Sequence, residues 1–258
     1  MDAPLKKALV TGAAAGLGLA ITRRLVGEGW HVVAADRDAA ALARLGEAVT
    51  QAVCDFSDPE GLDALSAELA GQGPYALAIL NAGINATGQF ETVSIDRQQA
   101  LVTVNLSAPM ILTSALVRAD AVAASGTLVF ISSLSRYVGY PGAATYAATK
   151  EGIAVFARSV RRPLARRGVR VLTACPGPLD TAHAAEHAPP GADAGKRMKP
   201  EDAARHILAA AARPGLAGLF LGGNVIVPGM GPKAMALAGR LFPGLATHIM
   251  RRLIFEKF

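Results

Sequence analysis

The sequence predicts a doubly wound α/β fold, in which one mostly parallel, seven-stranded sheet carries helices on both faces. Short apolar runs alternate along the chain with longer alanine-rich segments of helical spacing, which is typical of strands joined by crossover helices. The runs are apolar throughout, as expected of strands buried on both faces of a sheet. With 258 residues, 52% of them hydrophobic, and no linker-like stretch, the chain is expected to form one domain over residues 1–258.

The elements can be placed in order along the chain. The expected strands cover residues 8–11, 31–35, 52–54, 77–80, 127–131, 169–174 and 219–221. Between them, large aliphatic residues recur at helical spacing, as in Leu17-Ile21-Leu25 and Leu62-Leu65-Leu69. Asp38 is suited to cap a helix over residues 39–49.

A glycine-rich turn follows the first expected strand. It reads Thr11-Gly-Ala-Ala-Ala-Gly-Leu-Gly18 and leads directly into a helical pattern. Glycines let the backbone approach a dinucleotide pyrophosphate, whose charge is stabilised by bare N–H groups at the start of a helix. The turn alone is weak evidence for a dinucleotide site, because any tight strand-to-helix turn can use glycines. The residues around it therefore decide the interpretation.

Polar side chains recur where successive expected strands end. Asp36 closes the second strand, Asp55 follows the third, and Asn81-Ala82-Gly83 follows the fourth. Open α/β sheets bind ligands at this edge. The Asp36 carboxylate is placed to accept hydrogen bonds from an adenosine ribose, and the alternative role of capping a helix is better filled by Asp38. The context therefore favours a dinucleotide site.

Tyr146 and Lys150 form a Tyr-x-x-x-Lys pair on one face of an expected helix. A free tyrosine ionises near pH 10, so proton exchange at neutral pH requires a lower pKa, which a neighbouring ammonium group provides. Such pairs also arise by chance on protein surfaces. Upstream, Ile131-Ser132-Ser133 ends the fifth expected strand, where the hydroxyls are either turn formers or groups that point at a substrate oxygen.

Taken in order, these motifs resemble the short-chain dehydrogenase/reductase family. The resemblance covers about residues 5–225 and includes Asn105 and Pro176-Gly177; Leu80 departs from it, because many relatives carry a second asparagine there. It implies a single-domain Rossmann fold, often a homodimer or homotetramer. It also implies an oxidoreductase that interconverts an alcohol with a ketone or aldehyde by hydride transfer. A catalytically inactive dinucleotide-binding sensor or scaffold is the alternative, which the complete motif set disfavours.

The resemblance also implies a role for each catalytic residue. Tyr146 is the general acid/base, while Lys150 lowers its pKa and holds the nicotinamide ribose. Ser133 orients the substrate oxygen, and Asn105 supports a water relay. Ser133 is preferred over Ser132 because side chains alternate along a strand, and over both Ser132 and Ser135 because the family spacing to the tyrosine selects it.

The expected cofactor is NAD, with NADP possible. The carboxylate of Asp36 would repel the 2′-phosphate of NADP, whereas Arg37 could attract it. Ala15 stands where relatives that use NADP commonly carry a basic residue. The expected cofactor contacts are Gly12, Gly16, Leu17, Gly18, Asp36, Arg37, Asp55, Phe56, Asn81, Gly83, Tyr146, Lys150, Pro176, Gly177 and Thr181.

Residues 180–200, rich in alanine, proline and glycine, occupy the position of a substrate lid in relatives. The expected pocket residues are Ser135, Tyr140 and His183, and the expected substrate is a moderately apolar alcohol or ketone. His183 and His187 stand four apart, a spacing that can hold a metal on a helix. No metal site is expected, because the implied mechanism needs none.

Residues 230–258 are expected to form an amphipathic helical tail. Leucine or isoleucine recurs at every fourth position from Leu237 to Leu253, with basic residues between, and Pro243-Gly244 is expected to kink or split the helix. Two interpretations stay open. The tail is either a terminal helix that packs over the pocket or a partner subunit, or a basic element that rests on a membrane surface.

Charge and cysteine content narrow the class of protein. The net charge of +6 comes largely from arginines between residues 158 and 170, which lack interleaved aromatic residues, so a solvated face is favoured over nucleic-acid binding. Cys54 and Cys175 have no metal-type spacing and suggest two buried thiols in a reducing cytoplasm. No signal peptide is expected at the start, and polar or proline residues interrupt the apolar windows 98–117 and 214–232.

Overall fold

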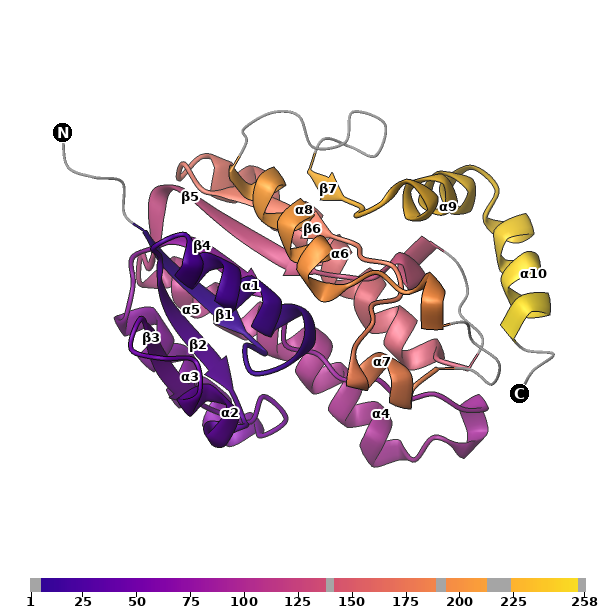
Figure 1. Cartoon of the computed structure of the whole chain (residues 1–258), viewed down its shortest axis with the longest axis horizontal. Coiled ribbons are helices and arrows are strands. Elements are labelled where there is room, and N and C mark those ends of the chain that lie inside the picture. Colours follow the sequence, from indigo (N-terminus) through magenta and orange to yellow (C-terminus); the bar gives the residue numbers. More distant parts are fainter. Residues whose placement is uncertain (1–5, 138–141, 189–193, 213–223, 255–258) are drawn as a thin grey trace.

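The computed structural model describes residues 6–137, 142–188, 194–212 and 224–254. Its centre is one sheet of seven strands in the order β3-β2-β1-β4-β5-β6-β7, and every neighbouring pair is parallel (Figure 1). The strands are β1 Lys7–Thr11, β2 His31–Asp36, β3 Val49–Val53, β4 Tyr75–Leu80, β5 Val122–Ile131, β6 Arg170–Ala174 and β7 Val225–Ile226. The predicted doubly wound Rossmann architecture is confirmed.

The strand order reverses direction at β1. The chain moves outward from β1 to β3, returns to pair β4 with the other side of β1, and continues outward to β7. In the register of these pairs, Leu9 of β1 lies between Val33 of β2 and Ala78 of β4. A crevice forms at the carboxyl ends of strands where such an order reverses, and ligands of doubly wound sheets bind there.

Helices cover both faces of the sheet. Helices α1 (Gly16–Gly27) and α8 (Pro200–Ala212) pack on one face, and α3 (Pro59–Gly71), α5 (Ala108–Arg118) and α6 (Ala144–Ala165) pack on the other. The remaining α-helices are α2 Ala39–Ala43, α4 Ile95–Val102, α7 Ala182–Glu186, α9 Met230–Leu241 and α10 Pro243–Ile254. Short turns complete the order: η1 Phe90–Thr92, the π-helical η2 Thr103–Ser107, η3 Leu134–Tyr137 and η4 Ala194–Lys196.

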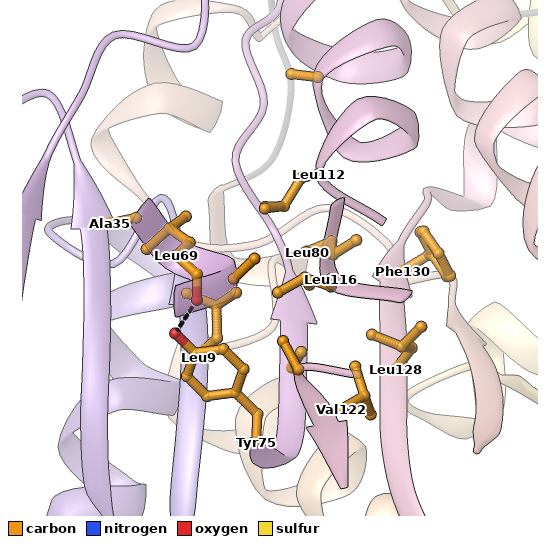
Figure 2. Packing of buried hydrophobic residues seen from close by; sticks show 14 of the residues in the cluster. Leu9, Ala35, Leu69, Tyr75, Leu80, Leu112, Leu116, Val122, Leu128 and Phe130 are labelled. Atoms are coloured by element: carbon orange, nitrogen blue, oxygen red, sulfur yellow. Dashed lines mark hydrogen bonds between the residues drawn. The ribbon is translucent and has the colours of Figure 1, made fainter. Parts of the chain in front are cut away.

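Two apolar layers hold the helices to the sheet. The predicted stripe of α1 and that of α3 are both buried, in opposite layers. Tyr75, at the start of β4, is fully buried and donates a hydrogen bond of 2.6 Å to the Leu69 carbonyl at the end of α3 (Figure 2). Burial raises the pKa of Tyr75, so its hydroxyl stays a neutral donor.

The structure corrects two local predictions, and a third falls outside the described residues. The helix expected over 39–49 ends at Ala43, because Gly46 adopts a φ of +90° and the chain enters β3 at Val49. Cys175 is buried as expected, but Cys54 is only partly buried at the end of β3. The strand expected over 219–221 falls outside the described residues, and the seventh strand is Val225–Ile226. The tail splits before Pro243, as predicted.

The helical stretch Ile95–Arg118, which joins α4, η2 and α5, is long and apolar enough to span a membrane, with a mean hydropathy of 1.8. Leu101, Leu112 and Leu116 on this stretch are almost completely buried against the sheet and its neighbouring helices. We therefore interpret it as a core helix.

Two glycines of α1 provide a test of the close packing at the first turn. A Cβ on Gly18 would collide with the Gly12 carbonyl oxygen, whereas a Cβ on Gly27 would meet nothing. We expect Gly18→Ala to lower the free energy of unfolding by about 1–3 kcal/mol through overpacking. Gly27→Ala should raise it by up to about 1 kcal/mol through helix propensity. Chemical denaturation of the cofactor-free protein measures both, and equal stability of the two variants would contradict the packing.

Candidate active site

The turn between β1 and α1 is shaped to receive an anion. Gly12 and Gly16 adopt φ values of +64° and +50°, and the N–H of Gly12 donates to the Ala35 carbonyl at 2.8 Å. Ala15 caps α1 without any side-chain hydrogen bond, and the first turn of the helix contains no acidic residue. The positive end of α1 is therefore open to a phosphate, which is the fit that a dinucleotide requires.

Thr11 and Asn81 fasten this turn to the end of β4. The Thr11 hydroxyl oxygen accepts hydrogen bonds from the N–H groups of Asn81 (2.9 Å) and Ala82 (3.0 Å). The Asn81 amide donates to the carbonyls of Thr11 (3.0 Å) and Gly12 (3.2 Å). The amide nitrogen of Asn81 thus holds the two strand ends together. We call these four hydrogen bonds the latch between Thr11 and Asn81. The sequence analysis used Thr11 only to mark the turn, but its hydroxyl accepts two of the four bonds.

Asp36 lies at the end of β2 beside the glycine turn. Its half-buried carboxylate accepts hydrogen bonds from the N–H groups of Ala14 (2.9 Å) and Asp38 (3.1 Å). Asp38 in turn caps α2 by accepting a hydrogen bond of 2.8 Å from the Ala41 N–H, as predicted. Asp36 is therefore oriented by the turn that it faces.

The loops that follow β2 and β3 carry three further predicted residues. Arg37 directly follows β2, and Asp55 and Phe56 come just after β3. The Asp55 carboxylate accepts hydrogen bonds from the N–H and hydroxyl of Ser57, and the N–H in particular lowers the pKa of Asp55. The positive charge of Arg37, which is exposed, also lowers the pKa of Asp55. The Phe56 side chain is buried in the core, so its contact with a cofactor would come from its backbone.

Helix α6 brings Tyr146 and Lys150 together. They lie one turn apart, with the Lys150 Nζ 5.7 Å from the centroid of the Tyr146 ring. Lys150 is only 5% exposed, and its Nζ donates a hydrogen bond of 3.0 Å to the Ile131 carbonyl at the end of β5. Burial lowers the pKa of Lys150 to about 8. The ammonium form still predominates at neutral pH, close to the tyrosine.

The three serines after β5 have different environments. The Ser132 hydroxyl is buried and donates to the Lys150 carbonyl at 2.7 Å, which ties the strand end to α6. Ser133 is half-buried, and its hydroxyl oxygen accepts a hydrogen bond of 3.2 Å from the Ser135 N–H. The Ser135 hydroxyl is buried without a partner among the described residues. Ser132 is thus a structural link that the sequence analysis did not identify.

Asn105 occupies the π-helical turn between α4 and α5. Its side-chain oxygen accepts from the Ile84 N–H at 2.8 Å, and its amide donates to the Ile84 carbonyl at 2.9 Å and to the Thr149 hydroxyl at 3.2 Å. Gly83 lies beside this group, since a Cβ there would be 3.2 Å from both the Asn105 oxygen and the Lys150 Nζ. The ends of β4 and α4 therefore meet α6 at Lys150.

The segment over residues 180–200 is pinned at its base. Asp180 donates its N–H to the Met198 carbonyl at 2.8 Å, and Met198 donates to the Pro178 carbonyl at 3.0 Å. Beyond this point Thr181 caps α7 by accepting from the Ala184 N–H at 3.1 Å, and its methyl group lies against Gly16. The start of the segment therefore contacts the glycine turn.

The remaining predicted residues adjoin this segment. The Pro176 carbonyl accepts a hydrogen bond of 3.0 Å from the Leu134 N–H, so the Pro176-Gly177 loop is joined to the loop after β5. A Cβ on Gly177 would lie 3.3 Å from Pro232 in the first turn of α9. Leu17 is buried in the first turn of α1. Tyr140 lies outside the described residues.

His183, Glu186 and His187 form a cluster on α7 whose ligating atoms all lie within 4.8 Å of one another. Burial lowers the pKa of both histidines, and the cations Arg97 and Lys150 lower that of His183 further. Neutral imidazoles are the form that binds a metal, but the same nearby cations oppose the binding of another positive ion.

The chain is similar to known proteins over most of its length. A family model described as short chain dehydrogenase matches residues 6–190. The chain belongs to this family. A 1-deoxy-11-beta-hydroxypentalenate dehydrogenase of Streptomyces exfoliatus is 35% identical over 192 residues, covering 70% of each chain. The 3-oxoacyl-[acyl-carrier-protein] reductase MabA of Mycobacterium avium is 30% identical over 177 residues, covering 68% of each.

A solved structure extends the similarity to most of the short-chain dehydrogenase fold. A Beutenbergia cavernae protein, assigned as an NAD(P)-dependent gluconate 5-dehydrogenase and containing NADP at low occupancy, superposes with a TM-score of 0.74. It is 29% identical to this chain, and the match covers 89% of this chain and 97% of that one. The expected family and Rossmann fold are confirmed, and a nicotinamide dinucleotide is the cofactor class that these relatives support.

The burial of Lys150 predicts a pH-dependent stability. The ammonium has an ordinary pKa of 10.5 in the unfolded chain but about 8 in the fold. The unfolded chain therefore binds more protons between these values, so the presence of Lys150 costs progressively more stability as pH falls from about 10.5 to 8. We compare the unfolding free energy of Lys150→Met with that of wild type at each pH. The difference between the two proteins should favour the variant by about 3 kcal/mol more at pH 7 than at pH 10. Denaturation of both proteins at each pH measures this difference, and a pH-independent difference would contradict the shifted pKa.

Proposed function

We propose that this short-chain dehydrogenase interconverts a secondary alcohol with a ketone, or a primary alcohol with an aldehyde, with Tyr146 as the general acid/base. The observation that carries the proposal is the buried Lys150 ammonium, which lies beside the Tyr146 ring and is fixed by the Ile131 carbonyl. An inactive dinucleotide-binding sensor would have no need of this arrangement.

The bound nicotinamide supplies or accepts a hydride at the substrate carbon. For reduction, the Tyr146 hydroxyl donates its proton to the carbonyl oxygen as that oxygen gains charge. The phenolate left on Tyr146 is stabilised by the Lys150 ammonium, and Ser133 donates a hydrogen bond to the same substrate oxygen. For oxidation, the phenolate of Tyr146 takes the alcohol proton. Asn105 and the end of α4 would connect Lys150 to solvent through water.

The residues of the cleft fit a dinucleotide. The glycine turn and the open start of α1 would hold the pyrophosphate, Asp36 would bind the adenosine ribose, and Asp55-Phe56 would face the adenine. Lys150 would hold the nicotinamide ribose. Pro176, Gly177 and Thr181 would hold the carboxamide, with Asn81 and Gly83 at the strand end between the two halves.

We propose NAD as the preferred cofactor. Asp36 is held by the Ala14 N–H, so its charge is fixed beside the turn, and a 2′-phosphate there would meet a carboxylate. Arg37 is exposed and lies near enough to affect Asp55, which leaves it free to turn toward a phosphate. The Beutenbergia cavernae relative contains NADP, so the phosphorylated dinucleotide is the competing cofactor that the test below must exclude.

An apolar substrate is supported by a small hollow beside the start of α6. It is lined mainly by apolar groups, including Ala86, Phe90, Val93 and Leu101, and is bounded by Gly142 to Thr145. We propose that the segment 180–200 closes over this side as a lid, with Ser135, Tyr140 and His183 lining the pocket. These side chains border the first turn of α6, the helix that carries Tyr146, so they are placed to contact an apolar part of the substrate.

We further propose a cytoplasmic homo-oligomer. Large apolar side chains on α4, α5 and α6 are exposed to solvent in the single chain. They are Ile95, Val102, Met110, Ile111 and Val155. Exposed apolar side chains on neighbouring helices favour association, and a second copy of the chain offers the same side chains by two-fold symmetry.

Tyr146→Phe tests the proposed chemistry. Loss of the hydroxyl removes the general acid, so turnover should fall by roughly 10²- to 10⁴-fold while the affinity for dinucleotide is retained. Cofactor absorbance with a panel of secondary alcohols and ketones measures turnover, and fluorescence titration measures the affinity.

Tyr75→Phe is the matched control, because it removes a tyrosine hydroxyl that is buried in the core, where it donates to the Leu69 carbonyl. It should retain turnover. Activity of Tyr146→Phe close to that of wild type would rule out the proposed role, and loss of dinucleotide binding would indicate a structural effect instead.

Asp36→Ser tests cofactor preference. Removal of the carboxylate relieves a repulsion of about 1–4 kcal/mol, so the ratio of kcat/KM for NADP to that for NAD should rise by roughly 5- to 1000-fold. Asp63→Ser on the exposed side of α3 removes the same charge at a distance and should leave the ratio unchanged. Equal or better use of NADP by the wild-type protein would overturn the NAD assignment.

A further inference from the structure

The tail helices α9 and α10 lie at the end of the molecule away from β3 (Figure 1). The inner side of α9 is fixed: Ala236 and Gly239 are buried, and Gly239 lies directly against the backbone of Tyr137 in η3. Pro232 lies over Gly177. One side of α9 therefore covers the loops that border the cleft, in agreement with the first of the two interpretations of the tail.

The outer side of the tail remains exposed. Six large apolar side chains between residues 230 and 245 are between 41% and 80% exposed: Met230, Met235, Leu237, Leu241, Phe242 and Leu245. Exposed apolar groups gathered within one short segment are unusual for a protein surrounded by water, and they indicate a surface that meets another apolar medium.

The charge of the same segment is of one sign. Residues 227–254 contain Lys233, Arg240, Arg251 and Arg252 but no aspartate or glutamate. Lys233 and Arg240 are exposed beside the apolar side chains. A helix that combines exposed apolar groups with basic groups complements a surface that is apolar beneath an anionic layer.

A second copy of the chain is a poorer complement to this face. A two-fold contact places the same patch against itself, so the basic groups of one copy would meet those of the other with no acidic partner in the segment. We propose that α9 and α10 form a docking surface for an anionic lipid bilayer, made by the exposed apolar residues named above together with Lys233 and Arg240.

Docking by this surface would hold the cleft close to the bilayer, because α9 also covers η3 and the Gly177 loop. An apolar alcohol or ketone dissolved in the membrane would then reach the cleft over a short path. This consequence rests on the proposed function, whereas the docking itself does not and is tested by binding alone.

The experiment uses the full chain and flotation with phosphatidylcholine vesicles that contain or lack phosphatidylglycerol. Wild-type protein should bind the anionic vesicles and dissociate at high salt, because attraction between lysine or arginine and the lipid charge is screened. Lys233→Glu/Arg240→Glu should reduce the partition coefficient at least 10-fold. Arg162→Glu/Arg166→Glu, which makes the same change in net charge at the end of α6, should reduce it by less than about 3-fold.

The apolar contribution is tested separately. Leu241→Ser/Phe242→Ser should weaken binding to anionic vesicles at least 10-fold, and Val53→Ser, an exposed apolar control on β3, should not. Circular dichroism and dinucleotide titration confirm that each variant is folded.

Three results of the flotation experiments would overturn the proposal. These are no binding by wild type, equal binding to neutral and anionic vesicles, and equal loss in the α6 control. Sedimentation velocity provides a further test: if Leu241→Ser/Phe242→Ser dissociates an oligomer, the face is an interface between copies and the membrane assignment is wrong.

Discussion

The arrangement of the site depends on a single buried cation. Lys150 is part of α6 and is almost fully removed from solvent, and its ammonium is fixed by the Ile131 carbonyl at the end of β5. Burial of a charge is unfavourable unless polar partners surround it. The Ile131 carbonyl is such a partner, and Gly83 lies close to both the ammonium and the Asn105 side chain. The position of Tyr146, one turn earlier on the same helix, follows from where Lys150 is held.

The sheet topology explains why these groups meet. Parallel strands end at one edge, so residues far apart in the sequence are brought to a common line there. Ser132 connects that edge to the backbone of Lys150, and Asn105 connects the β4 loop to Thr149 on the same helix. The polar groups of the edge therefore stabilise one another as well as a ligand.

Much of this could be predicted from the sequence, because the decisive features are local. Apolar runs, glycines before a helical stripe, and the spacing of Tyr146 and Lys150 depend on neighbours along the chain. The predicted helix over 39–49 failed because its end is determined by Gly46 and by the pairing of β3 with β2, a tertiary interaction. The roles of Thr11 and Ser132 were missed for the same reason: a lone hydroxyl has no pattern, and its partner becomes visible only in the fold.

The latch between Thr11 and Asn81 joins residues that are 70 positions apart. Loop closure over such a separation is costly in entropy, so contacts of this kind form late in folding. During synthesis, the first strands emerge with all the glycines of the cofactor turn but without the amide that holds the turn against β4. The β1–α1 turn can acquire its final shape only after Asn81 has left the ribosome. The segment that is synthesised first therefore depends on one that is synthesised about 70 residues later.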